Sequence, residues 1–334
     1  MYCNQCGISF LLHEKGYLYI NTTENLSAYK LEPHGDGWWY IPYDNHQELL
    51  ERIQLLTKAQ DQSLSALCLK RKIPSAGIPL KSLIIQLQNK NTISIIQSGE
   101  LISFLQPIID LQKDDQLFGY ESLLRTKEDN DISPGALFST AAKAGMLSLL
   151  DQRAREAAIR AKNLFIPKGV KSFINFLPST IYNPDFCLQH TFHLVNKYAI
   201  DPADLVFEVV ESEQIEDMGH LKKVLQTYKR EGMKVALDDV GAGYSTLEVL
   251  KMLDPDFVKI DRQFIQFCDQ ESRKQQFLGE VMELANELDI TVLAEGIERK
   301  EELEYCRSLG VQLAQGFFIG KPSPNPVYKT VSAN

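Results

Sequence analysis

Eight short apolar runs between residues 102 and 317 are each interrupted by a polar residue near the position where a strand would finish. Burying so many carboxylates, amides and lysines is costly unless they share a charge partner. A divalent metal ion is the partner that such oxygen-rich side chains suggest. The residues concerned are Gln106, Glu121, Asn175, Glu208, Asp238, Asp239, Lys259, Glu295 and Gln315. We therefore expect them to form one active site.

The spacing of apolar residues predicts alternating helices and strands from about residue 134 onward. Helices are expected near 150–165, 217–231, 273–288 and 300–309, with apolar strands between them. Strands that are apolar on both faces indicate a parallel sheet covered by helices, and eight of them favour a closed barrel. The polar turn at 110–116 is too short for a parallel crossover, so the first two strands should be antiparallel. The predicted fold is α/β, a (β/α)8 TIM-like barrel with one antiparallel strand.

Residues 1–95 have a different pattern and are expected to form a small α+β N-terminal module before a barrel domain at 96–330. Short strands are predicted at 17–20 and 38–40, an amphipathic helix at 46–60, and a turn at 89–92 near the junction. Cys3 and Cys6 leave a zinc site open, beside the simpler interpretation as two ordinary thiols. We interpret this module as regulatory or as a contributor to assembly.

Charge and hydropathy restrict the partners of the chain. A net charge of −9 argues against binding long nucleic acid, which requires a basic surface, but it allows a small phosphate ligand held through metal ions. No apolar stretch approaches the ~20 residues of a membrane-spanning helix. The N-terminus has neither the basic start nor the apolar core of a signal peptide. We expect a cytoplasmic protein without a membrane span.

The acidic residues among these polar positions suit phosphodiester chemistry. Without cations, carboxylates gathered at one barrel mouth would have raised pKa values and would repel phosphate. The adjacent pair Asp238 and Asp239 can hold two Mg²⁺ or Mn²⁺ ions that clamp the attacking and leaving oxygens. Lys259 could orient or help to deprotonate the attacking water. Any one of these acids alone is more often a surface carboxylate, but the ordered set favours an active site.

Six motifs carry a resemblance to a known family. They read YESLLR at 120–125, FEVVES at 207–212, DDVGAGYS at 238–245, VKID at 258–261, AEGIE at 294–298 and QG at 315–316. In order and spacing they resemble the EAL-domain cyclic-di-GMP phosphodiesterases over about residues 99–325. The resemblance implies hydrolysis of one phosphodiester of 3′,5′-cyclic di-GMP to linear pGpG by a homodimer, in bacterial second-messenger signalling.

The resemblance also implies a role for each matching residue. It implies two Mg²⁺ or Mn²⁺ ions per active site, with the metal ligands Glu121, Asn175, Glu208, Asp238 and Asp239. It implies catalytic roles for Lys259, which orients water, for Glu295, the acid beside that water, and for Glu211, which anchors the loop after Asp239. It implies substrate contacts for Gln106, Arg125, Glu298 and Gln315.

Two departures from the family pattern bear on how the chain works. The name motif reads Glu-Ser-Leu, which leaves its acid in place, and Val240 and Ala242 replace the residues more usual in the loop after Asp239. That loop links the metal site to dimerisation in the family. Two alternatives to hydrolysis stay open: a cyclic-di-GMP receptor that is catalytically weak, and a protein-interaction module without turnover. The complete ligand set speaks against both.

Overall fold

The computed structural model describes residues 13–59, 65–69, 77–127, 132–210, 217–240 and 247–326. Contacts within the chain group it into two compact units, one made of Met1–Glu100 with Thr126–Leu150 and the other of Leu101–Arg125 with Asp151–Asn334. No helix in these described ranges is both long enough and apolar enough to cross a membrane.

The first unit contains a five-stranded antiparallel sheet in the order β2-β3-β1-β4-β5. The strands are β1 Gly16–Asn21, β2 Glu32–Gly35, β3 Trp38–Tyr43, β4 Ser65–Leu69 and β5 Ile78–Pro79. The helices are η1 Ser27–Tyr29, α1 His46–Ala59, α2 Leu80–Gln88, α3 Lys90–Ser98 and α4 Pro134–Ala144. Leu18, Ile41, Leu49 and Leu83 pack together in its core. This confirms the small α+β module; Cys3 and Cys6 lie outside the described residues.

The turn predicted at 89–92 is wrong beyond its first residue. Helix α2 ends at Gln88 and α3 begins at Lys90, so Asn89 alone interrupts the helical path. The Asn89 side chain donates to the Ile85 carbonyl at 2.8 Å, which satisfies an oxygen at the end of α2. The Ile93 N–H donates to the Asn89 carbonyl at 2.9 Å and starts the next helix at once.

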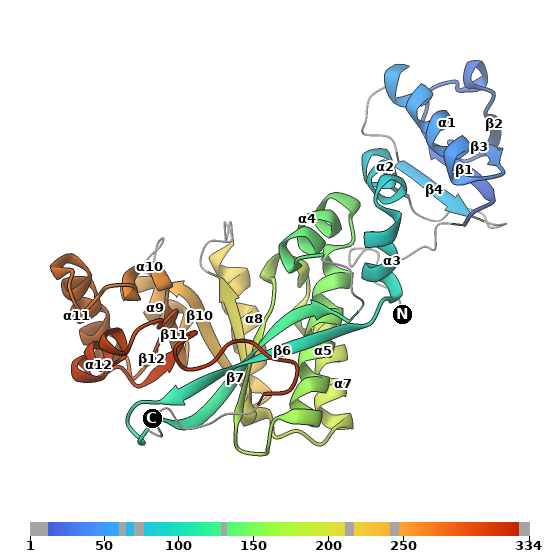
Figure 1. Ribbon diagram of the computed structural model, residues 1–334. Coiled ribbons are helices and arrows are strands. Elements are labelled where there is room, and N and C mark those ends of the chain that lie inside the picture. Colours follow the sequence, from blue (N-terminus) through green and yellow to red (C-terminus); the bar gives the residue numbers. More distant parts are fainter. Residues whose placement is uncertain are drawn as a thin grey trace. The chain divides into compact units, whose positions relative to one another are not determined.

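The second unit is a closed barrel in the order β10-β11-β12-β13-β6-β7-β8-β9 (Figure 1). Strand β6 pairs antiparallel with β13, whereas the neighbouring pairs from β7 round to β13 are parallel. A tight turn closed by the Gln116 N–H on the Lys113 carbonyl joins β6 to β7. The TIM-like barrel with one reversed strand is therefore confirmed. Its strands are β6 Leu101–Asp110, β7 Gln116–Thr126, β8 Lys171–Asn175, β9 Leu205–Val210, β10 Lys234–Val240, β11 Phe257–Ile260, β12 Thr291–Ala294 and β13 Leu313–Gln315.

Helices follow the parallel strands and cover the barrel from outside. Figure 1 shows α11 and α12 beside β11 and β12. The buried face of α8, with Leu221, Val224 and Tyr228, packs into the same core as Val235 of β10. The elements of this shell are α5 Leu147–Phe165, η2 Pro178–Thr180, α6 Pro184–Cys187, α7 Gln189–Lys197, η3 Pro202–Asp204, α8 Met218–Arg230, α9 Leu247–Leu253, α10 Arg262–Ile265, α11 Ser272–Glu287 and α12 Lys300–Leu309.

Candidate active site

Inside the barrel, a layer of apolar side chains is followed along the strands by a layer of polar side chains. The apolar layer takes one residue from each of seven strands, with Phe118 of β7 packed against it: Ile108, Phe173, Val206, Ala236, Phe257, Leu293 and Leu313. Residues two apart in a strand point to the same side. Two positions further along the parallel strands stand Asn175, Glu208, Asp238, Lys259, Glu295 and Gln315. Gln106 stands two positions before Ile108, as the reversed direction of β6 requires.

The polar residues do not all finish their strands, which corrects one detail of the sequence interpretation. Gln106, Glu121 and Glu208 lie well inside β6, β7 and β9. Barrel strands are tilted and staggered, so a layer perpendicular to the barrel axis crosses each strand at a different point along its length. The common level of these side chains, rather than the strand ends, defines the site.

Lys259 is the centre of this layer and is fully buried. Its Nζ lies 2.5 Å from Oε2 of Glu208 and 2.7 Å from Oε1 of Glu295. It also lies 3.2 Å from Oδ1 of Asp238 and 3.7 Å from Oε1 of Glu121. Four carboxylates from four strand segments therefore converge on one ammonium group, as the sequence interpretation expected of a shared site.

Glu121 connects this cluster to two amides. Asn175 Nδ2 donates to Oε1 of Glu121 at 3.2 Å, and Gln315 Nε2 donates to Oε2 at 2.7 Å. The amides fix the orientation of the carboxylate from both sides. The predicted ligand Asn175 thus has its amide nitrogen on Glu121, which leaves its carbonyl oxygen as the atom suited to a cation.

The clustering of like charges shifts the proton affinities of the site. Burial raises the pKa of Glu208 well above its usual value, and Glu121 and Asp238 add to this rise against the opposing effect of Lys259. Burial, with Asp238 and Glu121, raises the pKa of Glu295 to about 8, again against Lys259. Burial alone would lower the pKa of Lys259, but the surrounding carboxylates raise it well above its usual value. One lysine does not balance four acids.

A groove of about 190 Å³ opens beside this cluster. Its walls include the predicted residues Gln106, Glu121, Glu295, Glu298 and Gln315. Sequence reasoning missed Arg262 and Phe317, which also line it. Arg262 follows Lys259 by three residues, at the start of α10, and Phe317 follows Gln315 by two residues, but neither spacing by itself predicts a place on the groove. Arg262 forms an ion pair with Glu298 at 2.9 Å across the groove wall.

Three residues predicted for the site are not placed at the groove by the described part of the structure. Arg125 does not line the groove: its guanidinium donates to the Leu124 carbonyl at 2.7 Å and lies 5.4 Å from the centre of the Phe104 ring. Asp239 belongs to β10, and its side chain is outside the described part of the structure. Glu211 lies outside the described residues altogether. The roles suggested for these three residues stay predictions.

Two buried oxygens of the site are of the kind that bind a hard divalent cation. Glu208 Oε1 and Gln315 Oε1 are buried and have no hydrogen-bond partner among the described residues. Oxygen atoms of this kind are the ligands that Mg²⁺ and Mn²⁺ prefer. Within the described ranges, no three His, Cys, Asp or Glu side chains stand ready to hold a metal. Lys259 occupies the point where the carboxylates converge, so cation binding at that point would require the carboxylates or the lysine to shift.

The family model of the EAL domain matches residues 86–322, which is most of the chain. The chain belongs to the EAL domain family. Its EAL domain is 33% identical over 234 residues to the probable cyclic di-GMP phosphodiesterase PdeG of Escherichia coli K12, and that match covers 68% of the chain and 45% of PdeG. It is 32% identical over 233 residues to the cyclic di-GMP phosphodiesterase PdeF of the same organism, over 69% of the chain and 31% of PdeF. The chain thus spans less than half the length of these relatives.

A solved EAL structure agrees with the fold. The standalone versatile EAL protein from Vibrio cholerae O395, determined in its c-di-GMP-bound form, is 30% identical with a TM-score of 0.63. The match covers 71% of this chain and 99% of that chain. The EAL barrel described above is therefore shared with a protein that holds the cyclic dinucleotide.

Proposed function

We propose that this chain hydrolyses one phosphodiester of 3′,5′-cyclic di-GMP to linear pGpG. The observation that carries the proposal is the convergence of four carboxylates on Lys259, two of which, Glu121 and Glu295, line a groove. Relatives named as cyclic di-GMP phosphodiesterases support the choice of substrate. This activity would place the chain in second-messenger signalling in the cytoplasm.

Two divalent cations are part of this proposal. Glu121, Asn175, Glu208, Asp238 and Asp239 would hold Mg²⁺ or Mn²⁺. When bound, such ions neutralise the phosphate charge and make water a better nucleophile at neutral pH. The excess of negative charge around Lys259 supports them, because cations would remove the repulsion that adds to the effect of burial in raising the pKa of Glu208 and Glu295.

We assign positioning, proton transfer and ligand contacts to different residues of the chain. Lys259 holds Glu208 and Glu295 in place and would orient the attacking water. Glu295 lies just after β12 at the groove and would accept a proton from the attacking water. Gln106 and Gln315 would donate hydrogen bonds to the ligand, and Glu298 would also contact it. A groove of about 190 Å³ is small for the whole dinucleotide, so it would receive one phosphate and its sugar.

Matched variants test this proposal. Purified chain is incubated with cyclic di-GMP and Mn²⁺, and products are separated by chromatography. We expect Glu121→Ala, Asp239→Asn and Lys259→Met to lose at least ~100-fold in turnover, in line with the loss of a proton-transfer or charge-stabilising group. Lys234→Met, which removes a lysine with a half-exposed side chain on β10, serves as the control and should retain activity.

The outcomes separate the proposal from its alternatives. Nucleotide binding without product from the wild type would indicate a receptor, and absence of both would indicate an interaction module. We also propose a homodimer formed through the barrel, supported by the resemblance to the family as a whole, although the loop after Asp239 departs from the family pattern at Val240 and Ala242. Sedimentation velocity of the full chain would test it, and a monomer at all concentrations would contradict it.

A further inference from the structure

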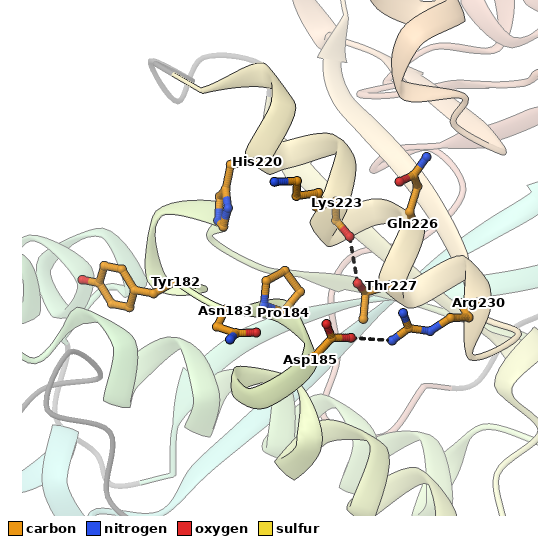
Figure 2. Close-up of a pocket in the computed structure, with 9 residues that line it drawn as sticks. All are labelled: Tyr182, Asn183, Pro184, Asp185, His220, Lys223, Gln226, Thr227 and Arg230. Carbon is orange, nitrogen blue, oxygen red and sulfur yellow. Dashed lines mark hydrogen bonds and ion pairs between the residues drawn. The ribbon is translucent and has the colours of Figure 1, made fainter.

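A second cavity lies between α6 and α8 on the outside of the barrel and shares no residue with the groove. Its volume is about 550 Å³, inside the ~300–1,000 Å³ typical of small-molecule sites. Figure 2 shows side chains of both helices around it, with Asp185 of α6 directed to Arg230 of α8 and with His220 and Lys223 along the upper side. Asn183, Gln226 and Thr227 also line it.

Positive charge in this cavity is only partly compensated. Arg230 pairs with Asp185 at 2.6 Å and, outside the cavity lining, with Glu231 at 3.6 Å, and all three side chains are exposed. Lys223 has no carboxylate within ion-pair distance among the described residues. The lining therefore presents two permanent cations and one carboxylate, with Glu231 beside Arg230 just outside it, so that Lys223 is the cation without a carboxylate partner among the described residues. An anion is the ligand that such a lining would attract.

Several hydrogen-bond donors in the cavity are unused. In the described part of the chain, the side-chain amides of Asn183 and Gln226 make no hydrogen bond. His220 Nε2 lies 2.5 Å from the Ile181 carbonyl and must donate to it, so Nδ1 is the ring nitrogen left for a ligand. A ligand rich in acceptor oxygens would satisfy these groups together with Lys223 and Arg230.

We propose that this cavity binds the phosphate group of a small phosphomonoester. A phosphomonoester carries close to two negative charges near neutral pH and three terminal acceptor oxygens. Lys223 supplies a point charge and Arg230 a planar fork, the two cationic groups that phosphate sites use. The volume leaves room for the rest of the ester beyond the phosphate. Asp185 and Glu231 compete with the ligand for Arg230, so their charges weaken binding.

The two helices that line the cavity follow barrel strands that carry residues of the active site. Helix α6 follows β8, which carries Asn175, and α8 is the helix after β9, which carries Glu208. A ligand held between α6 and α8 would therefore join the segments that follow two adjacent strands of the active site.

Calorimetric titration of the full chain with GMP, glucose 6-phosphate and inorganic phosphate tests this site at low ionic strength. We expect both esters to bind more tightly than inorganic phosphate. Lys223→Ala should weaken ester binding at least tenfold, while Asp185→Asn should tighten it by removing the nearer of the two carboxylates that pair with Arg230. Lys222→Ala is the matched control, because Lys222 is the neighbouring lysine on α8 and does not line the cavity.

Glu121→Ala separates this cavity from the barrel groove, which could also receive GMP. Ester binding that survives Glu121→Ala and is lost in Lys223→Ala supports the proposal, whether or not the chain hydrolyses cyclic di-GMP. Binding that is lost in Glu121→Ala and kept in Lys223→Ala would overturn it. So would the absence of ester binding at millimolar concentration, or binding of inorganic phosphate with both esters excluded.

Discussion

Glu302 is a fully buried carboxylate that supports the groove without lining it. Its Oε2 accepts the backbone N–H groups of Glu298 at 3.0 Å and Arg299 at 3.1 Å. Its Oε1 accepts the N–H of Phe267 at 2.9 Å. Glu298 itself lines the groove, so Glu302 holds the turn that presents it.

Glu302→Ala should lower the free energy of unfolding by about 3 kcal/mol, because three backbone donors lose their acceptor and each costs ~1–3 kcal/mol when buried unpaired. Urea unfolding followed by circular dichroism measures this. Glu302→Gln keeps one acceptor oxygen and should lower the free energy of unfolding by less than Glu302→Ala does. Glu301→Ala, at the exposed neighbouring position, should change stability by no more than ~0.5 kcal/mol. Equal stability of the two alanine variants would contradict this role.

Asp204 is a second buried carboxylate, and it contacts Lys162 and the backbone of Gly169. Lys162 Nζ lies 3.1 Å from its Oδ2, and the Gly169 N–H donates to the same oxygen at 2.8 Å. Burial alone would raise the pKa of Asp204, but the Gly169 hydrogen bond and Lys162 outweigh it and lower the pKa below its ordinary value.

A lowered pKa in the folded state fixes how Asp204 contributes to stability as the pH changes. The contribution is present above the unfolded-state pKa of 3.8 and is lost as the pH falls through the lower folded-state value. Asp204→Asn should therefore cost about 3 kcal/mol at pH 7, since it leaves Lys162 buried without its charge partner. The difference from wild type should shrink below pH 4. Asp289→Asn, on an exposed turn, is the control. A difference that stays constant with pH would contradict this assignment.

At the residue scale, the sequence identified the acids and Lys259 because each interrupts an apolar run. It could not identify Arg262 and Phe317, since an arginine and a phenylalanine in such contexts are ordinary surface and core residues. Their place on the groove depends on how the turns after β11 and β13 fold back. Arg125 shows the opposite case, because a motif position alone did not say that the side chain would pack on Phe104.

At the scale of elements, Gly316 joins β13 to the turn at 296–298. A Cβ on Gly316 would lie 2.1 Å from the Ile297 carbonyl oxygen and 2.2 Å from its nitrogen. Both contacts are with backbone, which has no flexible end to move aside. The Ile297 N–H also donates to the Gln315 carbonyl at 3.0 Å, so the two segments are held together at this point.

Gly316→Ala should therefore destabilise the chain by ~3 kcal/mol, near the upper end of the cost of an extra methyl group in a packed interior. It should also weaken cyclic di-GMP binding, because Gln315 and Glu298, the neighbours of Gly316 and Ile297 in the chain, both line the groove. Thermal unfolding and calorimetry measure the two effects. Gly135→Ala is the matched control, since a Cβ there meets nothing within 4 Å. A Gly316→Ala variant as stable as Gly135→Ala would contradict the close approach.

Helices and the reversed strand were the elements that sequence reasoning predicted best. The helix expected at 300–309 coincides with α12, and the one expected at 217–231 lies within a residue of α8 at each end. Apolar periodicity determines such segments locally. Positions within the barrel layer depend on strand stagger, which is set by pairing between strands distant in sequence. That is why Glu121 and Glu208 were expected at strand ends and lie inside β7 and β9.

At the scale of the whole molecule, the boundary proposed near residue 95 is open to a direct test. Within the first unit, α2 packs against α4, and Gln86 Nε2 donates to the Ala144 carbonyl at 2.9 Å. A chain that begins at residue 96 loses α2 and leaves this face of α4 uncovered. A chain that begins at residue 77 keeps it.

We therefore expect the chain that starts at residue 77 to unfold at a higher temperature than the one that starts at residue 96. Burial of Leu83 and the Gln86 hydrogen bond should together contribute ~2–4 kcal/mol to that difference. Differential scanning calorimetry of both truncations measures it. Identical unfolding temperatures would place the boundary of the barrel domain near residue 96 and would show that α2 contributes nothing to it.

The central claim is that the acids around Lys259 hold divalent cations which make a cyclic dinucleotide cleavable. The most direct measurement is chromatographic product analysis of cyclic di-GMP incubated with the wild-type chain, in the presence of Mn²⁺ and again with excess EDTA. We expect linear pGpG with Mn²⁺ and none with EDTA. Unchanged cyclic di-GMP in both reactions, or equal product in both, would contradict the claim.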